Sequence, residues 1–400
     1  MNRPCHAGQR QRRLPVAGIL GASAALAAGL FGAVVTAVAR RVVIPVPTRP
    51  LDARVLSAAP RQRTITLAAT PDTLLPGRYG LWVPGSERYH RLGPVLERTT
   101  QTVTRELIED DEVSRIVPGP ASFSGWYFRH PAELGLEFAD VMIETELGDA
   151  PAWRFPAPEP SADAPWAILV HGRGVQRPEV LRAVPVLHAA GYECLVVSYR
   201  NDGEAPASAD GRYGLGATEW RDVDAALAYA AEHGAPRVVL MGWSMGGAIV
   251  LQTAQRSIHD SIVDGVILDS PVVDWRSVLR FQAKASRIPP LVRDTAMWLI
   301  GSRAGRLLTG LRHPIDLDRL DRVAHAGELH HPVLILHSDD DGFVPSDASH
   351  ALAEARPDLV TLVTFSVARH TKLWNFAPER WSDAISEWLA RLNETARSAT

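Results

Sequence analysis

The sequence predicts an α/β fold, a mostly parallel β-sheet with helices on both faces. Two observations lead to it. After residue 138, short apolar runs alternate with helix-like stretches of about 12 to 16 residues, the pattern of strands joined by crossover helices. The runs are apolar along their whole length, as expected of strands that are covered on both faces. The region before residue 138 differs, since Pro and Gly break it into strand-like pieces without a helical period. We therefore expect a small β-rich module there.

The chain divides into five predicted segments. These are a basic tail (1–13), a transmembrane anchor or signal (14–39), a Pro-rich linker (40–59), the β-rich accessory module (60–137) and the α/β domain (138–395). In the accessory module the pattern predicts strands at 63–68, 79–83, 102–108 and 122–128. In the α/β domain it predicts strands at 141–147, 150–155, 166–170, 194–199, 237–243, 265–268, 333–336 and 359–365. Helices are predicted at 178–190, 217–232, 245–256, 346–355 and 378–392.

The apolar segment near the N-terminus is long enough to cross a membrane. No charged residue occurs from Leu14 to Ala39, and the 24 residues from Val16 to Ala39 would form a helix of about 36 Å, more than the roughly 30 Å of a hydrocarbon core. A signal peptide usually has a shorter apolar region, so we expect an uncleaved anchor. Cleavage after Ala37-Val38-Ala39 and twin-arginine export through Arg12-Arg13 are the alternatives.

The net charge of -3 conceals two unlike parts. Residues 1–50 hold seven arginines and no acid, which leaves 35 basic and 45 acidic side chains in the other 350 residues. Residues 1–50 are therefore +7 and the body -10, which argues against a nucleic-acid partner for the body. Arginines flank the apolar segment, with more of them before it, so the positive-inside rule places the tail in the cytoplasm and the body outside. The two cysteines, Cys5 and Cys194, form neither a disulfide framework nor a thiolate metal site.

A Gly-x-Ser-x-Gly motif lies where a predicted strand meets a predicted helix. It reads Gly242-Trp243-Ser244-Met245-Gly246 and follows the apolar run 238–241. An abrupt strand-to-helix turn strains its central residue, and side chains at the two glycine positions would collide with neighbouring backbone. Such a turn would expose the Ser244 hydroxyl at the N-terminus of a helix. The motif is thus the first candidate for chemistry.

Three further motifs occur in the order found in one family. His171-Gly172-Arg173-Gly174 follows the strand at 166–170, and the loop 337–345, which holds Asp341, follows a late strand. His370 lies just beyond the last predicted strand. With the Ser244 motif, these features over about 138–395 resemble the α/β-hydrolase superfamily, in its membrane-anchored bacterial type. The resemblance implies an α/β-hydrolase fold and a serine hydrolase that needs no cofactor or metal.

The resemblance also implies a role for each residue. Ser244 would be the nucleophile, His370 its general base and Asp341 the acid that orients His370. Backbone N–H groups of Met245 and Arg173 would form the oxyanion hole. The Arg173 side chain is a candidate for binding an anionic substrate group. In this family an insertion such as 271–330 usually forms a lid; the alternative here is an ordinary packed pair of helices.

Other assignments stay open at this stage. Asp339 and Asp340 are alternative acids, because loop register is soft, and Asp269 is another, because it directly follows the strand at 265–268. His330, His331, His337 and the three aspartates at 339–341 suggest a metal site, but His330 and His331 are adjacent residues of an extended segment and point to opposite sides, so we expect none.

The favoured function is hydrolysis of carboxylic esters or thioesters, with a small-molecule or lipid-like acyl substrate and the membrane as the partner of the N-terminal helix. A serine peptidase on the same fold is the first alternative. A catalytically inactive, membrane-tethered binding protein is the second, from a different class.

Overall fold

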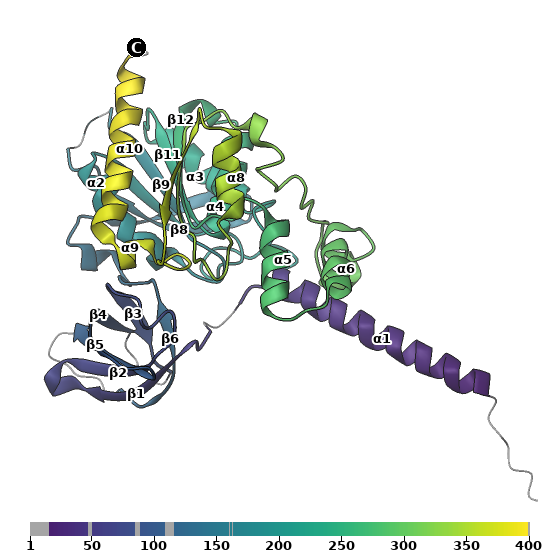
Figure 1. Cartoon of the computed structure of the whole chain (residues 1–400). Coiled ribbons are helices and arrows are strands. Elements are labelled where there is room, and N and C mark those ends of the chain that lie inside the picture. The colour runs from purple at the N-terminus through teal and green to yellow at the C-terminus, as the bar shows by residue number, and fades with distance from the viewer. Residues whose placement is uncertain are drawn as a thin grey trace, which may run out of the picture.

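The computed structural model describes residues 16–46, 50–84, 89–108, 116–159, 161 and 163–398 (Figure 1). It contains an N-terminal helix, a small β-barrel and a larger α/β domain. The predicted tail, residues 1–13, lies outside the described residues.

The α/β domain is built on an eight-stranded sheet of order β14-β13-β12-β11-β9-β10-β8-β7. Its strands are β7 (Ala139–Thr145), β8 (Gly148–Phe155), β9 (Trp166–Val170), β10 (Glu193–Val197), β11 (Val238–Trp243), β12 (Val263–Asp269), β13 (Val333–Ser338) and β14 (Val360–Phe365). The six strands from β14 to β10 are parallel, whereas β8 pairs antiparallel with both β10 and β7. The predicted mostly parallel sheet is confirmed.

Helices cover both faces of this sheet. Side chains of β9 alternate between two hydrophobic clusters, with Ile168 in one and Leu169 in the other. The first face is covered by α3 (Trp220–Glu232), α4 (Met245–Arg256) and α8 (Asp347–Ala355). The second is covered by α2 (Val184–Ala189), α9 (Leu373–Phe376) and α10 (Pro378–Ser398). The 271–330 insertion forms α5 (Trp275–Ala285), α6 (Pro290–Gly301) and α7 (Arg306–Thr309).

The accessory module is a closed six-stranded barrel of order β1-β2-β5-β4-β3-β6. Its strands are β1 (Ala53–Ala59), β2 (Thr64–Ala68), β3 (Tyr79–Trp82), β4 (Tyr89–Arg98), β5 (Thr102–Ile108) and β6 (Gly119–Ser124). Its interior holds the buried Arg105, which donates to the carbonyls of Thr73, Leu75, Gly77 and Gly93. Burial lowers the pKa of this guanidinium to about 10. Since every carbonyl it binds is neutral, Arg105 is a buried charge solvated by backbone dipoles.

Two barrel strands were not expected from the sequence. Strand β4 contains Gly93 and Pro94, which interrupt a strand pattern, and its pairing with β5 shifts register between Leu92 and Val95. Strand β1 lies within the segment that we assigned to the linker. Together with the helix that continues to Val43, it leaves a shorter connection than the predicted 40–59.

The N-terminal helix α1 (Val16–Val43) projects away from the α/β domain and meets it at its C-terminal end (Figure 1). Within it, Ala25–Val43 is long and apolar enough to cross a membrane, a test that signal sequences also pass. The last turns pack on α6 and α7, and Val35, Ala39 and Val43 are buried there. The end of α1 is thus part of the folded domain rather than a detached tether.

Candidate active site

Ser244 occupies a strained turn between β11 and α4. Its φ of 50° and ψ of -115° are rare for a residue with a side chain. Its amide donates to the carbonyl of Asp269 on the neighbouring strand, at 3.0 Å, and its carbonyl accepts from Gly247 and Val272. These three backbone bonds hold the strained conformation, so the hydroxyl has a fixed position at the carboxyl edge of the sheet.

The glycines on either side of Ser244 allow this turn. A Cβ at Gly242 would collide with the backbone of Gly246 one turn later. A Cβ at Gly246 would collide with the carbonyls of Val170 and His171. The tight turn from β11 into α4 therefore requires Gly242, and the close approach of α4 to the end of β9 requires Gly246.

The structure brings Ser244, His370 and Asp341 together although the chain separates them widely. His370 Nε2 lies 3.1 Å from Ser244 Oγ, and His370 Nδ1 lies 2.7 Å from Asp341 Oδ2. Asp341 follows β13 and His370 follows β14, so all three residues lie at the carboxyl edge of the sheet. The Phe343 ring packs against the imidazole, with centroids 5.1 Å apart.

The Asp341 carboxylate is buried but fully bonded. Oδ1 accepts from the amides of Phe343 and Val344, both at 2.8 Å. Oδ2 faces His370 and also lies 3.3 Å from His337 Nε2. Burial raises the pKa of Asp341, but the charge and hydrogen bonds of His370 and His337 outweigh it and hold the pKa well below its usual range. Asp341 is therefore an anion at neutral pH.

The other candidate acids have different partners. Asp339 accepts from Ser346 and His350 on the surface, and Asp340 accepts from Ser338 Oγ and the Arg369 amide. The fully buried Asp269 accepts from Ser270 Oγ and Trp381 Nε1. Of the aspartates considered, Asp341 is the one within hydrogen-bond distance of His370.

The loop after β9 passes directly beside Ser244. A Cβ built on Gly172 would lie 3.3 Å from the Ser244 Cβ. The amide of Gly172 donates to Glu179 at 2.8 Å, and its carbonyl accepts from the Tyr199 hydroxyl at 2.6 Å. The loop is therefore held rigidly where the resemblance requires an oxyanion donor. Arg173, whose backbone N–H is the candidate, follows Gly172, and Met245 directly follows the serine.

The Arg173 side chain is already engaged by the end of α1. It donates to the carbonyls of Arg41 and Ile44 at 2.8 and 3.0 Å, and burial lowers the pKa of its guanidinium. The Val43 carbonyl accepts from the Tyr213 amide at 2.8 Å. The sequence suggested that this guanidinium binds an anionic substrate group. In the structure it binds carbonyls at the end of the N-terminal helix instead.

The barrel contacts the loop that holds His370. Lys372 donates to Asp72 of the barrel at 3.0 Å, and Asn375 exchanges backbone and side-chain hydrogen bonds with Arg78. A small module without candidate catalytic residues thus supports the loop of the proposed base.

Two features were not foreseen from the sequence. His337 supports the acid from the preceding strand, and its Nδ1 lies 2.8 Å from the Ser349 hydroxyl. Its place in the run His337-Ser338-Asp339-Asp340-Asp341 was the available signal. The expectation that His330 and His331 point to opposite sides is wrong, since both contact Asp260. The chain bends at His331 instead of running straight into β13.

The comparisons with known proteins concern the family and the fold. The model of the alpha/beta hydrolase family matches residues 167–384, and the model of a domain of unknown function matches 54–124, most of the barrel. No curated protein matches the chain. An esterase from Pyrococcus furiosus has 18% identity and a TM-score of 0.51, covering 66% of this chain and 94% of its own.

Two other solved structures are less similar. The esterase Est1E from Butyrivibrio proteoclasticus has 17% identity and a TM-score of 0.47, over 64% of this chain and 99% of its own. A puromycin-hydrolyzing peptidase from Mycobacterium tuberculosis has 19% identity and a TM-score of 0.47, over 82% of this chain and 45% of its own. At these identities the likeness concerns the fold alone.

Proposed function

Because the chain belongs to the alpha/beta hydrolase family, we propose that it is a serine hydrolase that cleaves carboxylic esters or thioesters through an acyl-enzyme. The observation that carries the proposal is the chain of hydrogen bonds from Ser244 Oγ through His370 to the buried Asp341. A nucleophile that contacts a base, which is in turn oriented by a third group, is the arrangement this chemistry requires.

In the proposed reaction His370 Nε2 takes the Ser244 proton as Oγ attacks the substrate carbonyl. Asp341 holds Nδ1 protonated, so that Nε2 can act as the base, and stabilises the resulting imidazolium. The same proton then passes to the leaving alkoxide or thiolate, and the acyl group stays on Ser244. A water activated by His370 releases the acid and restores the hydroxyl.

The oxyanion of each tetrahedral intermediate would accept from the backbone N–H groups of Met245 and Arg173. Each such donor lowers the barrier by roughly 3 kcal/mol. The Gly172 bonds to Glu179 and Tyr199 support this role, because they fix the loop before substrate binds.

We assign the 271–330 insertion as a lid over an apolar acyl site. Gln282 on α5 donates to the carbonyl of Phe343, whose ring lies against His370, so the insertion borders the proposed triad. Helix α6 exposes Leu291 and Trp298, and α7 exposes Leu307. An apolar cover of this kind favours acyl esters over peptides as substrates.

We further propose that α1 anchors the enzyme as a single span, with the hydrolase domain outside the cytoplasm. The four arginines before the apolar segment, against two directly after it, support this orientation. The anchor ends on Arg173 and packs on α6, so the bilayer surface would lie next to the lid. A lipid-like acyl substrate would then reach the site without leaving the membrane surface.

The test is a panel of fluorogenic medium-chain esters, thioesters and aminoacyl amides. It uses the full chain in detergent micelles, because truncation before residue 42 would remove the buried Val35 and Ala39. We expect turnover of the esters or thioesters, and none by Ser244→Ala. Preference for the amides would support a peptidase instead. No turnover and no covalent labelling of a folded protein would support an inactive binding protein.

A further inference from the structure

A cluster of three potential metal ligands lies far from the proposed triad. Asp260 begins a short 3-10 turn before β12, and His330 and His331 lie just before β13. The cluster is therefore at the amino ends of these parallel strands, whereas Ser244 and Asp341 follow carboxyl ends. We refer to Asp260, His330 and His331 as the His–Asp cluster.

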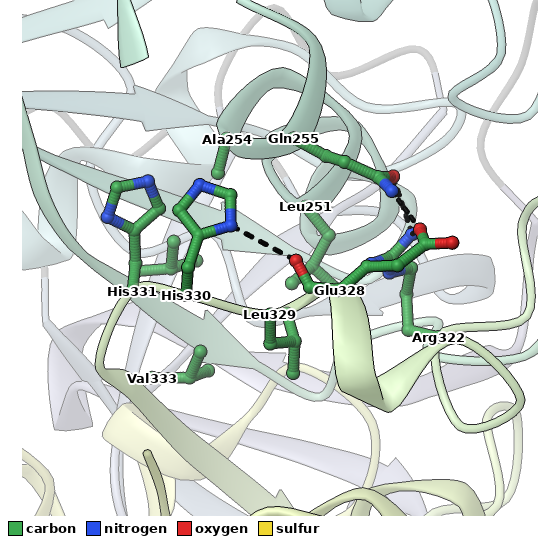
Figure 2. A pocket seen from close by; sticks show the side chains of 10 residues that line it. Leu251, Ala254, Gln255, Arg322, Glu328, Leu329, His330, His331 and Val333 are labelled. Atoms are coloured by element: carbon green, nitrogen blue, oxygen red, sulfur yellow. Dashed lines mark hydrogen bonds and ion pairs between the residues drawn. The ribbon is translucent and has the colours of Figure 1, made fainter. Parts of the chain in front are cut away.

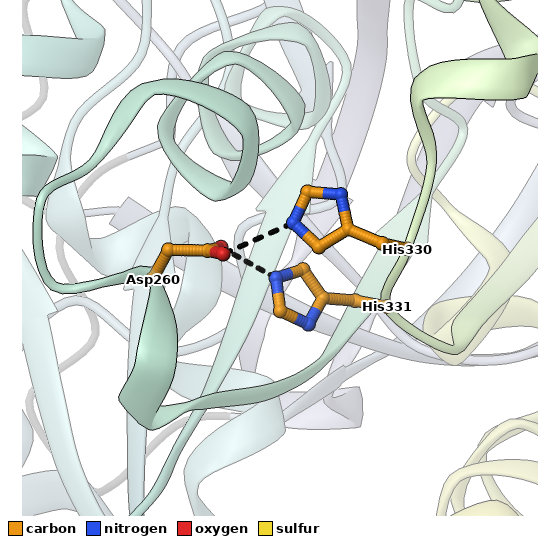
Figure 3. A group of neighbouring side chains, drawn as sticks. All are labelled: Asp260, His330 and His331. Atoms are coloured by element: carbon orange, nitrogen blue, oxygen red, sulfur yellow. Dashed lines mark hydrogen bonds and ion pairs between the residues drawn. The ribbon is translucent and has the colours of Figure 1, made fainter.

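The three side chains converge (Figure 3). His330 Nε2 lies 3.0 Å from Asp260 Oδ2, and His331 Nε2 lies 2.6 Å from Asp260 Oδ1. The two imidazole centroids are 4.3 Å apart, and one ligand atom from each residue lies within 4.8 Å of the others. Both oxygens of one carboxylate thus each face a ring nitrogen.

The other nitrogen of His330 bears on which of its ring nitrogens can bind a cation. His330 Nδ1 lies 3.1 Å from the backbone carbonyl of Glu328 (Figure 2). A carbonyl only accepts, so Nδ1 carries a hydrogen, and in the neutral ring Nε2 is then a bare acceptor. That acceptor faces a carboxylate oxygen, which also only accepts. The contact is attractive only if a second ring proton or a metal ion lies between the two atoms.

We propose that the His–Asp cluster binds a divalent transition metal of the zinc type, through Nε2 of His330, Nε2 of His331 and the Asp260 carboxylate, with water completing the coordination. Two histidines and one carboxylate are a ligand set that zinc uses when it keeps an open position. A ligating histidine usually donates its other ring N–H to an oxygen acceptor, as His330 does to Glu328.

The required movement is small. Tetrahedral bonds of about 2.0–2.2 Å place ligand atoms roughly 3.4 Å apart, so each of the two histidine–aspartate contacts must open by less than about 1 Å. The His330 side chain is half exposed and Asp260 is also partly exposed, so both can adjust. Next to the histidines lies a cavity of about 10 Å³, lined also by Arg322 and Glu328 (Figure 2). It has room for about one water molecule.

The experiment is titration of the full chain in detergent with Zn²⁺ by calorimetry, and with Co²⁺ by visible absorption. The protein for these titrations is prepared without a polyhistidine tag. We expect one ion per chain, the absorption of a tetrahedral Co²⁺ complex and a higher Tm with zinc. Asp260→Asn and His331→Ala should each weaken binding at least about tenfold. His350→Ala is the matched control, since His350 contacts a single carboxylate, that of Asp339, at 2.9 Å.

Equal binding by the wild type and both cluster variants would overturn the proposal, as would the lack of saturable binding by the wild type. Circular dichroism shows whether each variant is folded. His330→Ala, at the more exposed ligand, replaces His331→Ala if the latter does not fold. Weakened binding by the cluster variants together with unchanged binding by His350→Ala would support the site.

Discussion

Asp341→Asn tests the proposed role of the acid without changing its shape. Oδ1 accepts from the amides of Phe343 and Val344 and must therefore remain an oxygen in the variant. The new NH₂ group then takes the place of Oδ2 and faces His370 Nδ1. Two donors cannot pair, so the imidazole adopts the tautomer with hydrogen on Nε2. In that tautomer Nε2 cannot accept the proton of Ser244.

The expected loss follows from removing the base while leaving the rest of the site intact. A triad that loses the correct tautomer loses about 10⁴-fold in kcat, or roughly 5.4 kcal/mol of transition-state stabilisation. KM should change little, because Asp341 is buried behind His370. The assay is the initial rate of ester hydrolysis over a range of substrate concentrations, on full-length protein.

Asp340→Asn is the matched control, since Asp340 is the adjacent acid and accepts from Ser338 and the Arg369 amide. It should retain kcat within about tenfold of the wild type. A kcat of Asp341→Asn within tenfold of the wild type would refute the reasoning. So would an equal loss in both variants, which would indicate a general disturbance of the loop.

Three other predictions concern the surroundings of the triad. Arg173→Met keeps the backbone N–H but removes the hydrogen bonds to Arg41 and Ile44, each worth about 1.5 to 3 kcal/mol. Proteolysis after α1 should therefore accelerate, while kcat should fall less than on loss of an oxyanion donor. Unchanged proteolysis would contradict the docking of α1. Lys372→Met removes the hydrogen bond to Asp72 and should lower kcat without abolishing it. Lys284→Met, on α5, is the control. Equal kcat in both variants would mean that the barrel does not support the His370 loop. The folded-state pKa of Asp341 lies below its unfolded value of about 3.9, so this carboxylate contributes stability that is present above that pH and is lost as the pH falls through the folded pKa. Asp341→Asn should therefore lose less stability on acidification than the wild type in thermal unfolding, and parallel pH profiles would contradict this.

The sequence predicted the α/β sheet well, because its central strands are apolar on both faces and therefore appear as uninterrupted runs. Ser244, Asp341 and His370 could each be placed after a strand, and parallel strands bring such positions to one edge. Strand β4 was missed because Gly93 and Pro94 break its pattern. In the barrel β4 still pairs with β5, with a register shift at these two residues.

Contacts between distant segments could not be predicted in the same way. Nothing in the sequence near Arg173 indicates that its side chain binds the end of α1, since the partners are backbone carbonyls about 130 residues away. The bend that lets His330 and His331 share Asp260 depends likewise on the fold around β12 and β13. Alternation along an extended segment predicted opposite directions, and the local bend reverses that prediction.

Covalent labelling tests the central claim most directly. A fluorophosphonate probe reacts with a serine that is activated by a base, so the folded full-length protein should gain one adduct, on Ser244, detected by mass spectrometry of intact protein and peptides. Ser244→Ala should gain none, and Asp341→Asn should react much more slowly. An unlabelled wild type, or an adduct that persists in Ser244→Ala, would contradict the account.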